Sequence, residues 1–249
     1  MGAEALIAPP PQACDAPAMP SHSAHTSRDF ETELRELRAQ ALAMGARCER
    51  IVQLALDAFW SSAPSARAVI ESVDAQIDRD EIDLHALAMR ILALRQPVAA
   101  DLRFVAAALR LITDLERIGD EAVNISERAS EGDADAKNLV RADLESMGSM
   151  MQDMLRDALQ AFVDRDPAAA ERVLARDDRI DSLCSSIITS MTEHIARRSD
   201  EVRPGLRVIR VTKYVERIAD HATNIAEEVI FMVRGDDVRH GQYPPAGAR

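Results

Sequence analysis

Apolar residues recur every three or four positions through most of the chain, which is the spacing of amphipathic helices. The spacing holds from Phe30 to Trp60, and Ser61, Ser62 and Pro64 then interrupt it. No alternating strand pattern competes with it, so the sequence predicts an all-α protein. The same reading places five further helices at about 65–95, 98–131, 135–163, 167–197 and 205–234.

One segment occurs twice. The twelve residues Glu116 to Glu127, ERIGDEAVNISE, return one hundred positions later at Glu216 to Glu227 as ERIADHATNIAE, with eight identities. The chain is therefore an internal duplication, and we predict two tandem three-helix bundles. The expected divisions are a disordered leader at 1–27, a first bundle at 28–134, a second bundle at 135–235 and a disordered tail at 236–249.

Composition narrows the class of partner. Aromatic residues make up only 3% of the chain, so the core must be aliphatic, as suits helix bundles. The 42 acidic and 30 basic residues give a net charge of −12, which disfavours nucleic acid and anionic membrane surfaces as partners. Cations and basic protein surfaces fit this charge better.

The cysteines and the N-terminus favour a soluble, cytoplasmic protein. Cys14, Cys48 and Cys184 are odd in number and widely spaced, which indicates neither a disulfide framework nor a thiolate zinc site. The first residues lack a basic region followed by an apolar run, and no apolar stretch approaches the roughly 18 residues that span a bilayer. We therefore expect neither export nor membrane insertion.

The duplicated segment keeps acidic residues on one helix face. Glu116 and Asp120, like Glu216 and Asp220, are four positions apart and lie on one side of a helix. A second acidic pair with the same spacing occurs in the preceding helix of each unit. The eight carboxylates that we predict as metal ligands are Asp74, Asp78, Glu116, Asp120, Asp177, Asp181, Glu216 and Asp220.

Helix hairpins would bring these pairs together. Asp78 lies nineteen residues before Pro97 and Glu116 lies nineteen after it, so the two are level on antiparallel helices, and Asp74 is likewise level with Asp120. The second unit repeats this arrangement about a midpoint between Arg198 and Ser199, to within two or three residues. Each hairpin is thus expected to carry four converging carboxylates.

Four close carboxylates repel one another unless a cation neutralises them. Oxygen-rich sites suit Mg, Ca and Mn, and clustered carboxylates also hold Fe. His85 falls on the face of Asp74 and Asp78 and is a candidate further ligand, whereas His221 points about 100° away from Asp220. The alternative stays open, because acidic residues four apart on a helix are commonly just its solvated face.

At this point the sequence resembles a known family. The stretch RQPVAADLRFVAAALRLITDLERIGDEAVNISE from Arg95 and the stretch RVTKYVERIADHATNIAEE from Arg210 are similar to the PhoU family of phosphate-transport accessory and regulatory proteins. The similarity extends from about Phe30 to Arg234. Two departures stand out: Ser126 is paired with Ala226, and Cys184 with Ile188 occupy the places of Glu81 and His85.

The resemblance implies two three-helix bundles with multinuclear iron or zinc clusters on the acidic surfaces, and no enzymatic activity. It further implies a commonly dimeric regulator that damps the phosphate-starvation response and acts between the phosphate ABC transporter, through its ATPase, and the membrane sensor histidine kinase.

Two other functions remain to be weighed. A di-iron carboxylate enzyme would need Glu-x-x-His pairs facing a four-helix core, and the sequence contains none. A structural helical spacer or adaptor without bound metal would use the same acidic faces only for solubility, and it should carry no stoichiometric metal.

Overall fold

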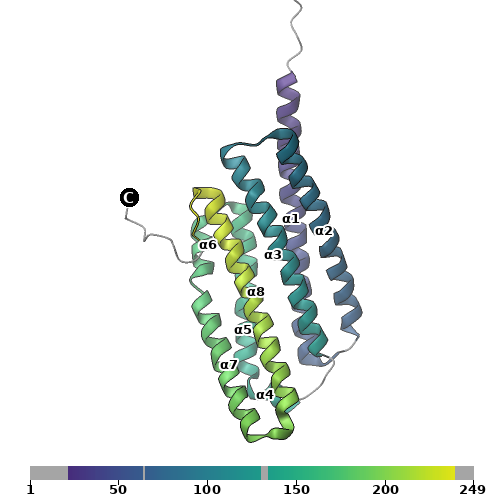
Figure 1. Cartoon of the computed structure of the whole chain (residues 1–249), viewed down its shortest axis with the longest axis vertical. Coiled ribbons are helices and arrows are strands. Elements are labelled where there is room, and N and C mark those ends of the chain that lie inside the picture. The colour runs from purple at the N-terminus through teal and green to yellow at the C-terminus, as the bar shows by residue number, and fades with distance from the viewer. Residues whose placement is uncertain (1–21, 64, 130–133, 239–249) are drawn as a thin grey trace, which may run out of the picture.

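The computed structural model describes residues 22–63, 65–129 and 134–238, which form helices and short connections (Figure 1). No strand occurs among these residues, so the all-α prediction is confirmed. In chain order the elements are α1 (His22–Ser61), α2 (Ala66–Arg95), α3 (Ala99–Ala129), α4 (Ala134–Leu139), α5 (Arg141–Asp164), α6 (Pro167–Leu174), α7 (Asp177–Arg197), the 3₁₀ turn η1 (Ser199–Glu201) and α8 (Val202–Arg234).

Two three-helix bundles lie side by side, as the duplication predicted. Helices α1, α2 and α3 pack together, and α5 packs with α8 and with the α6–α7 pair. The bundles meet where α3 lies along α8 and where α1 approaches α5 (Figure 1). Each contact joins a helix to its own duplicate, so the two units are related by an approximate two-fold axis.

Reciprocal contacts between α1 and α5 show this symmetry in detail. Leu159 of α5 lies over Gly45 of α1, where an added Cβ would sit 2.9 Å from its Cδ2 atom. Leu56 of α1 lies over Gly148 of α5, with the corresponding distance 3.4 Å. Gly148 lies 103 positions after Gly45, and Leu159 lies 103 positions after Leu56. The two contacts are therefore duplicates of each other, with the roles of α1 and α5 exchanged.

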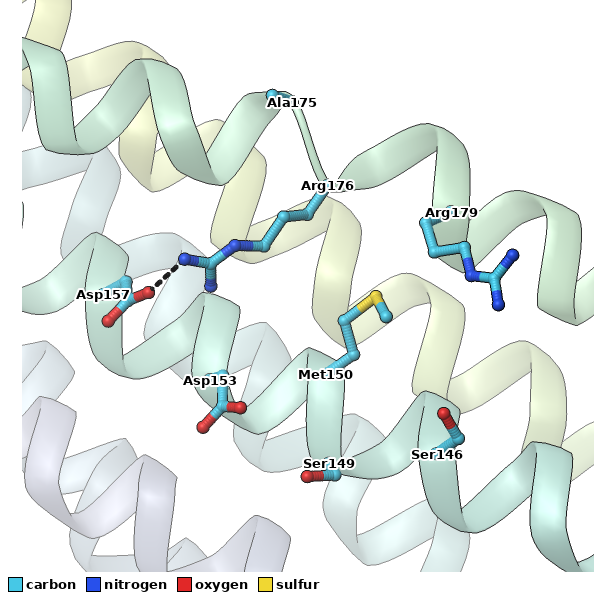
Figure 2. Close-up of a pocket in the computed structure, with 8 residues that line it drawn as sticks. All are labelled: Ser146, Ser149, Met150, Asp153, Asp157, Ala175, Arg176 and Arg179. Atoms are coloured by element: carbon cyan, nitrogen blue, oxygen red, sulfur yellow. Dashed lines mark ion pairs between the residues drawn. The ribbon is translucent and has the colours of Figure 1, made fainter.

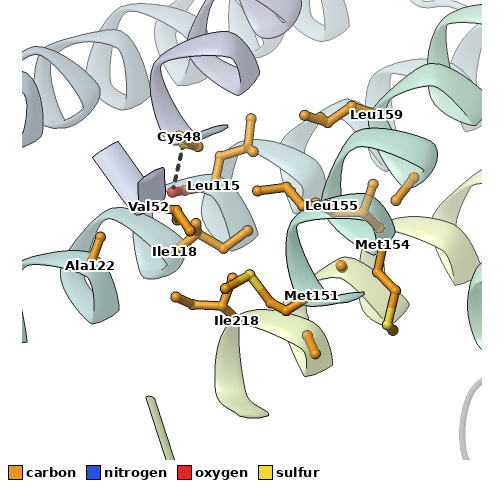
Figure 3. Packing of buried hydrophobic residues seen from close by; sticks show 14 of the residues in the cluster. Cys48, Val52, Leu115, Ile118, Ala122, Met151, Met154, Leu155, Leu159 and Ile218 are labelled. Atoms are coloured by element: carbon orange, nitrogen blue, oxygen red, sulfur yellow. Dashed lines mark hydrogen bonds between the residues drawn. The ribbon is translucent and has the colours of Figure 1, made fainter. Parts of the chain in front are cut away.

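The core is mainly aliphatic, with Phe59, Phe104 and Phe162 also fully buried, and it is continuous across the two bundles. Figure 3 shows Met151 and Leu155 of α5 near Ile118 of α3 and Ile218 of α8, and all four are fully buried. Burial of such side chains contributes about 1.5–3 kcal/mol each. Six apolar residues of the repeated segment are completely buried, namely Ile118, Ala122, Ile125, Ile218, Ala222 and Ile225.

Helix ends agree with the sequence in several places. α2 stops before Gln96, which takes a left-handed conformation with φ 48°, and Pro97 follows it. Asp166 caps α6 by accepting hydrogen bonds from the backbone N–H groups of Ala168 and Ala169, with Pro167 at the first helical position. Gly235, in a left-handed conformation with φ 80°, ends α8 directly after the predicted last residue 234.

The N-terminal leader was predicted too long. Helix α1 begins at His22, so the last six residues of the 1–27 segment are helical, while residues 1–21 lie outside the described part. After Pro20 no residue breaks a helix, and extending an existing helix costs far less than nucleating one. Composition alone therefore placed the helix start too late.

The fifth predicted helix, 167–197, is broken into α6 and α7 at Ala175 and Arg176. Val73 occupies the equivalent of Arg176 in the first unit and is buried in its core. A guanidinium cannot be buried there without a partner, and the break lets Arg176 reach Asp157 of α5 at 2.7 Å (Figure 2). The fourth predicted helix, 135–163, is likewise divided at Val140 into α4 and α5.

The beginning of the predicted disordered tail also has a defined place. Val238 is only 7% exposed and lines a hollow with Leu174 of α6 and Ile230 of α8. An apolar side chain buried against two helices offsets the entropy of ordering a short segment. Residues 239–249 lie outside the described part.

Lys137 of α4, in the second unit, forms hydrogen bonds with the end of α1 in the first unit. Its Nζ donates to the backbone oxygen of Phe59 at 2.6 Å and to Ser62 Oγ at 3.2 Å. It also lies 4.4 Å from the centre of the Phe59 ring. Phe59 is in the last turn of α1, where carbonyls lack intrahelical partners and a cation is favoured.

Replacing this lysine, Lys137→Met, should lower the free energy of unfolding by about 1–3 kcal/mol, because a buried carbonyl loses its charged donor. Chemical denaturation with helical circular dichroism measures this change. Arg197→Met is the matched control, since Arg197 forms an exposed ion pair with Glu193, and its cost should stay below about 1 kcal/mol. Equal costs for the two variants would contradict the role assigned to Lys137.

Candidate metal centre

Three of the predicted ligands meet in the second bundle. Asp177 and Asp181 lie one turn apart on α7, and Asp220 faces them from α8. One carboxylate oxygen from each lies within 4.8 Å of the other two. Among the described residues this is the one group of three acidic, histidine or cysteine side chains that comes so close. We call it the second-unit cluster.

The second-unit cluster is electrostatically crowded. Burial and the neighbouring carboxylates of Asp181 and Asp220 raise the pKa of Asp177 to about 6. Burial, followed by Glu216 and Asp181, also raises the pKa of Asp220. In addition, Asp177 Oδ1 is buried without a hydrogen-bond donor. A buried carboxylate oxygen without a donor fits a place for a cation.

Glu216, the fourth predicted ligand of this unit, is engaged differently. Its two carboxylate oxygens accept hydrogen bonds from Lys213 Nζ at 2.6 and 2.9 Å. Glu216 is still near enough to raise the pKa of Asp177 and of Asp220. It therefore lies beside the cluster and is paired with Lys213, a partner that the helical spacing alone did not predict.

The four predicted ligands of the first bundle also share one surface, which we call the first-unit cluster. Burial, Asp78 and Asp120 raise the pKa of Asp74 to about 6. Burial raises the pKa of Glu116, to which Asp120, Glu81 and Asp78 add repulsion. The equal-arm count across Pro97 is consistent with this placement, since Asp78 from α2 acts on Glu116 from α3.

Arginine partly neutralises the first-unit cluster. Arg117 Nε lies 3.3 Å from Glu116, and Arg117 Nη1 lies 3.2 Å from Asp120. Glu81 is a further acidic neighbour that was not among the predicted ligands, although its place three residues after Asp78 puts it on an adjoining part of α2. Each cluster thus holds carboxylates together with one basic side chain.

A glycine distinguishes the two clusters. Gly119 of α3 faces Asp74, and a Cβ at this position would lie 3.0 Å from Asp74 Oδ1. The duplicate position is Ala219, which carries that extra atom. Asp74 therefore approaches its neighbouring helix at a place where the second unit has a methyl group.

The two histidines considered from the sequence have separate surroundings. His85 Nε2 lies 4.0 Å from Glu81 Oε1 and is buried without a hydrogen-bond partner, so it borders the first-unit cluster. His221 turns away from Asp220, and its Nδ1 lies 2.8 Å from Asp114 of α3. His221 therefore joins the two bundles and is no part of the second-unit cluster.

The donor atoms in both clusters fit a hard cation. Oxygen ligands from aspartate and glutamate suit divalent and trivalent metals, and repulsion among them is relieved by bound positive charge. The close trio and the donor-free Asp177 oxygen carry this fit for the second unit. In both units a metal would compete with a basic side chain that the chain itself provides.

A duplicated helical protein with an acidic cluster on each hairpin is the class that this fold and site define. The family model described as PhoU domain matches residues 41–129 and again 144–229. The chain belongs to the PhoU family. The two matched ranges fall on the two bundles, and the resemblance drawn from the repeated segment is confirmed.

Similar proteins and solved structures lead to the same family. A Pseudomonas putida protein named phosphate-specific transport system accessory protein PhoU homolog is 36% identical over 220 residues, covering 87% of this chain and 85% of its own length. A Clostridium acetobutylicum protein with the same name is 30% identical over 214 residues, covering 86% and 98%. The crystal structure of PhoU from Pseudomonas aeruginosa has a TM-score of 0.80 at 33% identity, covering 83% of this chain and all of that one. PhoU from Streptococcus pneumoniae, described as a phosphate transport system regulatory protein, has a TM-score of 0.76 at 26% identity, covering 84% of this chain and 99% of that one.

Within the described residues, no helix combines the length and apolarity needed to cross a membrane.

The raised pKa values give a pH prediction for chelator-treated protein. Asp74 and Asp177 bind protons more tightly when folded, with pKa values of about 6 against an ordinary 3.8. Their protonation therefore stabilises the fold fully below about pH 4, and this contribution is lost as pH rises to about 6. The unfolding temperature should fall over that interval more steeply in the natural protein than in Asp74→Asn with Asp177→Asn, by about 2–4 °C. Calorimetry across this pH range measures the difference. If the unfolding temperatures of the two proteins fall in parallel with pH, the raised pKa values of Asp74 and Asp177 are contradicted.

Proposed function

We propose that the chain is a non-enzymatic, metal-binding accessory protein of a phosphate-specific transport system, acting in the cytoplasm. In this role it is a negative modulator of phosphate uptake and of the phosphate-starvation response. Its partners are the ATPase of the phosphate ABC transporter and the sensor histidine kinase. Family membership and the names of the relatives support the transport role. The second-unit cluster, with its close carboxylate oxygens, is the observation that carries the metal-binding part.

In the second unit Asp177, Asp181 and Asp220 would hold the ion. In the first unit the ligands would come from Asp74, Asp78, Glu116 and Asp120. Bound metal supplies positive charge that relieves the repulsion within each cluster. The all-oxygen donor set suits Mg or Mn as well as the iron or zinc that the resemblance implies.

Two basic side chains of the protein, Lys213 and Arg117, would compete with a metal ion for these carboxylates. Lys213 holds both oxygens of Glu216, and Arg117 contacts Glu116 and Asp120. A metal that recruits Glu216 or Glu116 must displace the basic side chain, which then becomes available at the surface. The charge presented to a partner therefore changes in two ways when metal binds, through neutralised carboxylates and through a released lysine or arginine.

One alternative has its own support. The same ion pairs reduce the repulsion in both clusters without any metal, as expected of a structural spacer or adaptor. The di-iron enzyme has less support, because the carboxylates lie on the side of α3 and α8 opposite the buried apolar residues. Metal content separates the first alternative from the proposal.

Protein purified without chelator should contain stoichiometric metal that depends on the clusters. Glu116→Ala with Asp120→Ala should halve the bound metal while helicity stays nearly intact, and Asp177→Asn with Asp181→Asn should remove the other half. Elemental analysis by mass spectrometry measures both. Glu145→Gln with Glu193→Gln is the control, since both residues form exposed ion pairs elsewhere. Metal content that is zero throughout would favour the spacer, whereas metal that stays unchanged in both cluster variants would contradict the assignment of these ligands.

Deletion of the gene should leave phosphate-starvation genes expressed at high phosphate, because the negative modulator is lost. A reporter from such a gene, measured in phosphate-replete cells, gives the readout. Expression of the natural chain should restore repression, and removal of the sensor kinase should abolish reporter activity in the deletion strain. Repression that persists without the gene would count against the regulatory role.

Pull-down of the tagged protein, probed for the transporter ATPase and the kinase, tests the partners.

A further inference from the structure

One end of the α3–α8 junction carries two arginines where the other end carries an ion pair. In that ion pair, Arg110 Nη1 of α3 donates to both carboxylate oxygens of Glu228 of α8, at 2.8 and 2.9 Å. Glu228 is nearly fully buried, so the pair lies within the junction itself. The duplicates of these two residues, one hundred positions away, are Arg210 and Arg128. The approximate two-fold axis therefore sets an arginine against an arginine at the second end.

Contacts along the junction give the same register without reference to the duplication. From the ion pair, eleven residues forward on α3 and eleven back on α8 lead to Glu121 and Arg217, whose side chains lie 3.2 Å apart. The two helices thus advance by equal steps in opposite directions, as antiparallel helices do. Another seven residues, or about two turns, bring Arg128 of α3 level with Arg210 of α8.

Both arginines have N–H groups that lack an acceptor. Arg210 is exposed, and among the described residues no carboxylate lies within ion-pair distance of it. The side chain of Arg128 is only 20% exposed, and its Nη1 lies 3.1 Å from the preceding residue, Glu127. Its Nε is buried and has no hydrogen-bond partner in the described part of the chain. A donor buried in this way is costly, which indicates that an acceptor from outside the chain completes the site.

The balance of charge at this end favours an anion. Glu127 balances Arg128, and Arg67, 3.8 Å from Glu127, has a nearer partner in Glu71 at 2.7 Å. Arg210 adds a positive charge that no described carboxylate balances. Although the whole chain has a net charge of −12, exposed charges are screened over about 8 Å at physiological ionic strength, so the near arginines decide what binds here.

We propose that Arg128 and Arg210 form a binding site for a phosphate group. The carboxylate of Glu228 satisfies one arginine at the other end, whereas two arginines match an anion with more oxygens and up to two negative charges. Guanidinium groups bind such oxygens through paired N–H donors. Arg210 lies ten residues, or about 15 Å along α8, from Asp220, so the site is separate from the second-unit cluster. The inference does not rest on metal binding or on the regulatory role.

Phosphate titration of the chelator-treated full chain tests the site, because bound metal could itself hold phosphate. Sodium chloride keeps the ionic strength constant. About 10 mM phosphate should raise the unfolding temperature by about 3–5 °C relative to chloride, as half-saturation on the order of 1 mM requires. Arg210→Gln and Arg128→Gln should each weaken phosphate binding about tenfold or more. Arg203→Gln is the matched control, since Arg203 is an exposed arginine two turns earlier on α8, and it should keep the natural response.

The sign of the Arg210→Gln effect separates a binding site from a structural arginine. Without phosphate the unfolding temperature of this variant should not fall, because the substitution removes repulsion from Arg128. With phosphate it should be lower than that of the natural protein. A fall of equal size under both conditions would overturn the proposal.

Glycerol 3-phosphate distinguishes the two sources of the phosphate group. If it stabilises the natural protein as inorganic phosphate does, the site accepts phosphate esters, whereas a response to inorganic phosphate alone assigns the free anion. Absence of any response beyond chloride would overturn the proposal. An equal loss in Arg203→Gln would do the same, because it would show only a diffuse attraction of anions.

Discussion

The division of α3 and α8 into an apolar side and an acidic side is the constraint on which the rest of the molecule depends. On one side Ile118 and Ile218 are buried at the junction of the two bundles. On the other side Asp120 and Asp220 face the neighbouring helices α2 and α7. The packing that fixes these two helices therefore also fixes the clusters. A carboxylate held by a rigid core cannot move away from its neighbours, so its charge must be balanced where it stands.

Much of this arrangement could be predicted from the sequence because it follows from periodicity. The apolar spacing identified the helices, and the repeat identified the two bundles. Counting equal arms from Pro97 placed Asp78 near Glu116, as the raised pKa of Glu116 supports. Such counts succeed because a helix has a fixed rise per residue and a tight turn adds few uncertain positions.

The remaining features depend on contacts between residues far apart in the chain. The break before α7 arises because Arg176 stands where a buried Val73 stands in the first unit, and its partner Asp157 belongs to another helix. The pairing of Lys213 with Glu216 is local, yet rotamer choice decides it, and periodicity gives no information on rotamers. The early start of α1 at His22 reflects helix propagation, which composition underestimates.

The reciprocal leucine-on-glycine contacts have an evolutionary consequence. Leu56 over Gly148 and Leu159 over Gly45 repeat one contact in both directions, as two identical subunits would. A single bundle standing alone would leave the junction side of α3 open to water. Each three-helix unit therefore needs a second copy of itself to cover that side, and one polypeptide now supplies both copies. Once the halves were joined, each was free to acquire substitutions without its twin. The methyl group of Ala219 opposite the hydrogen of Gly119 is one trace of that divergence.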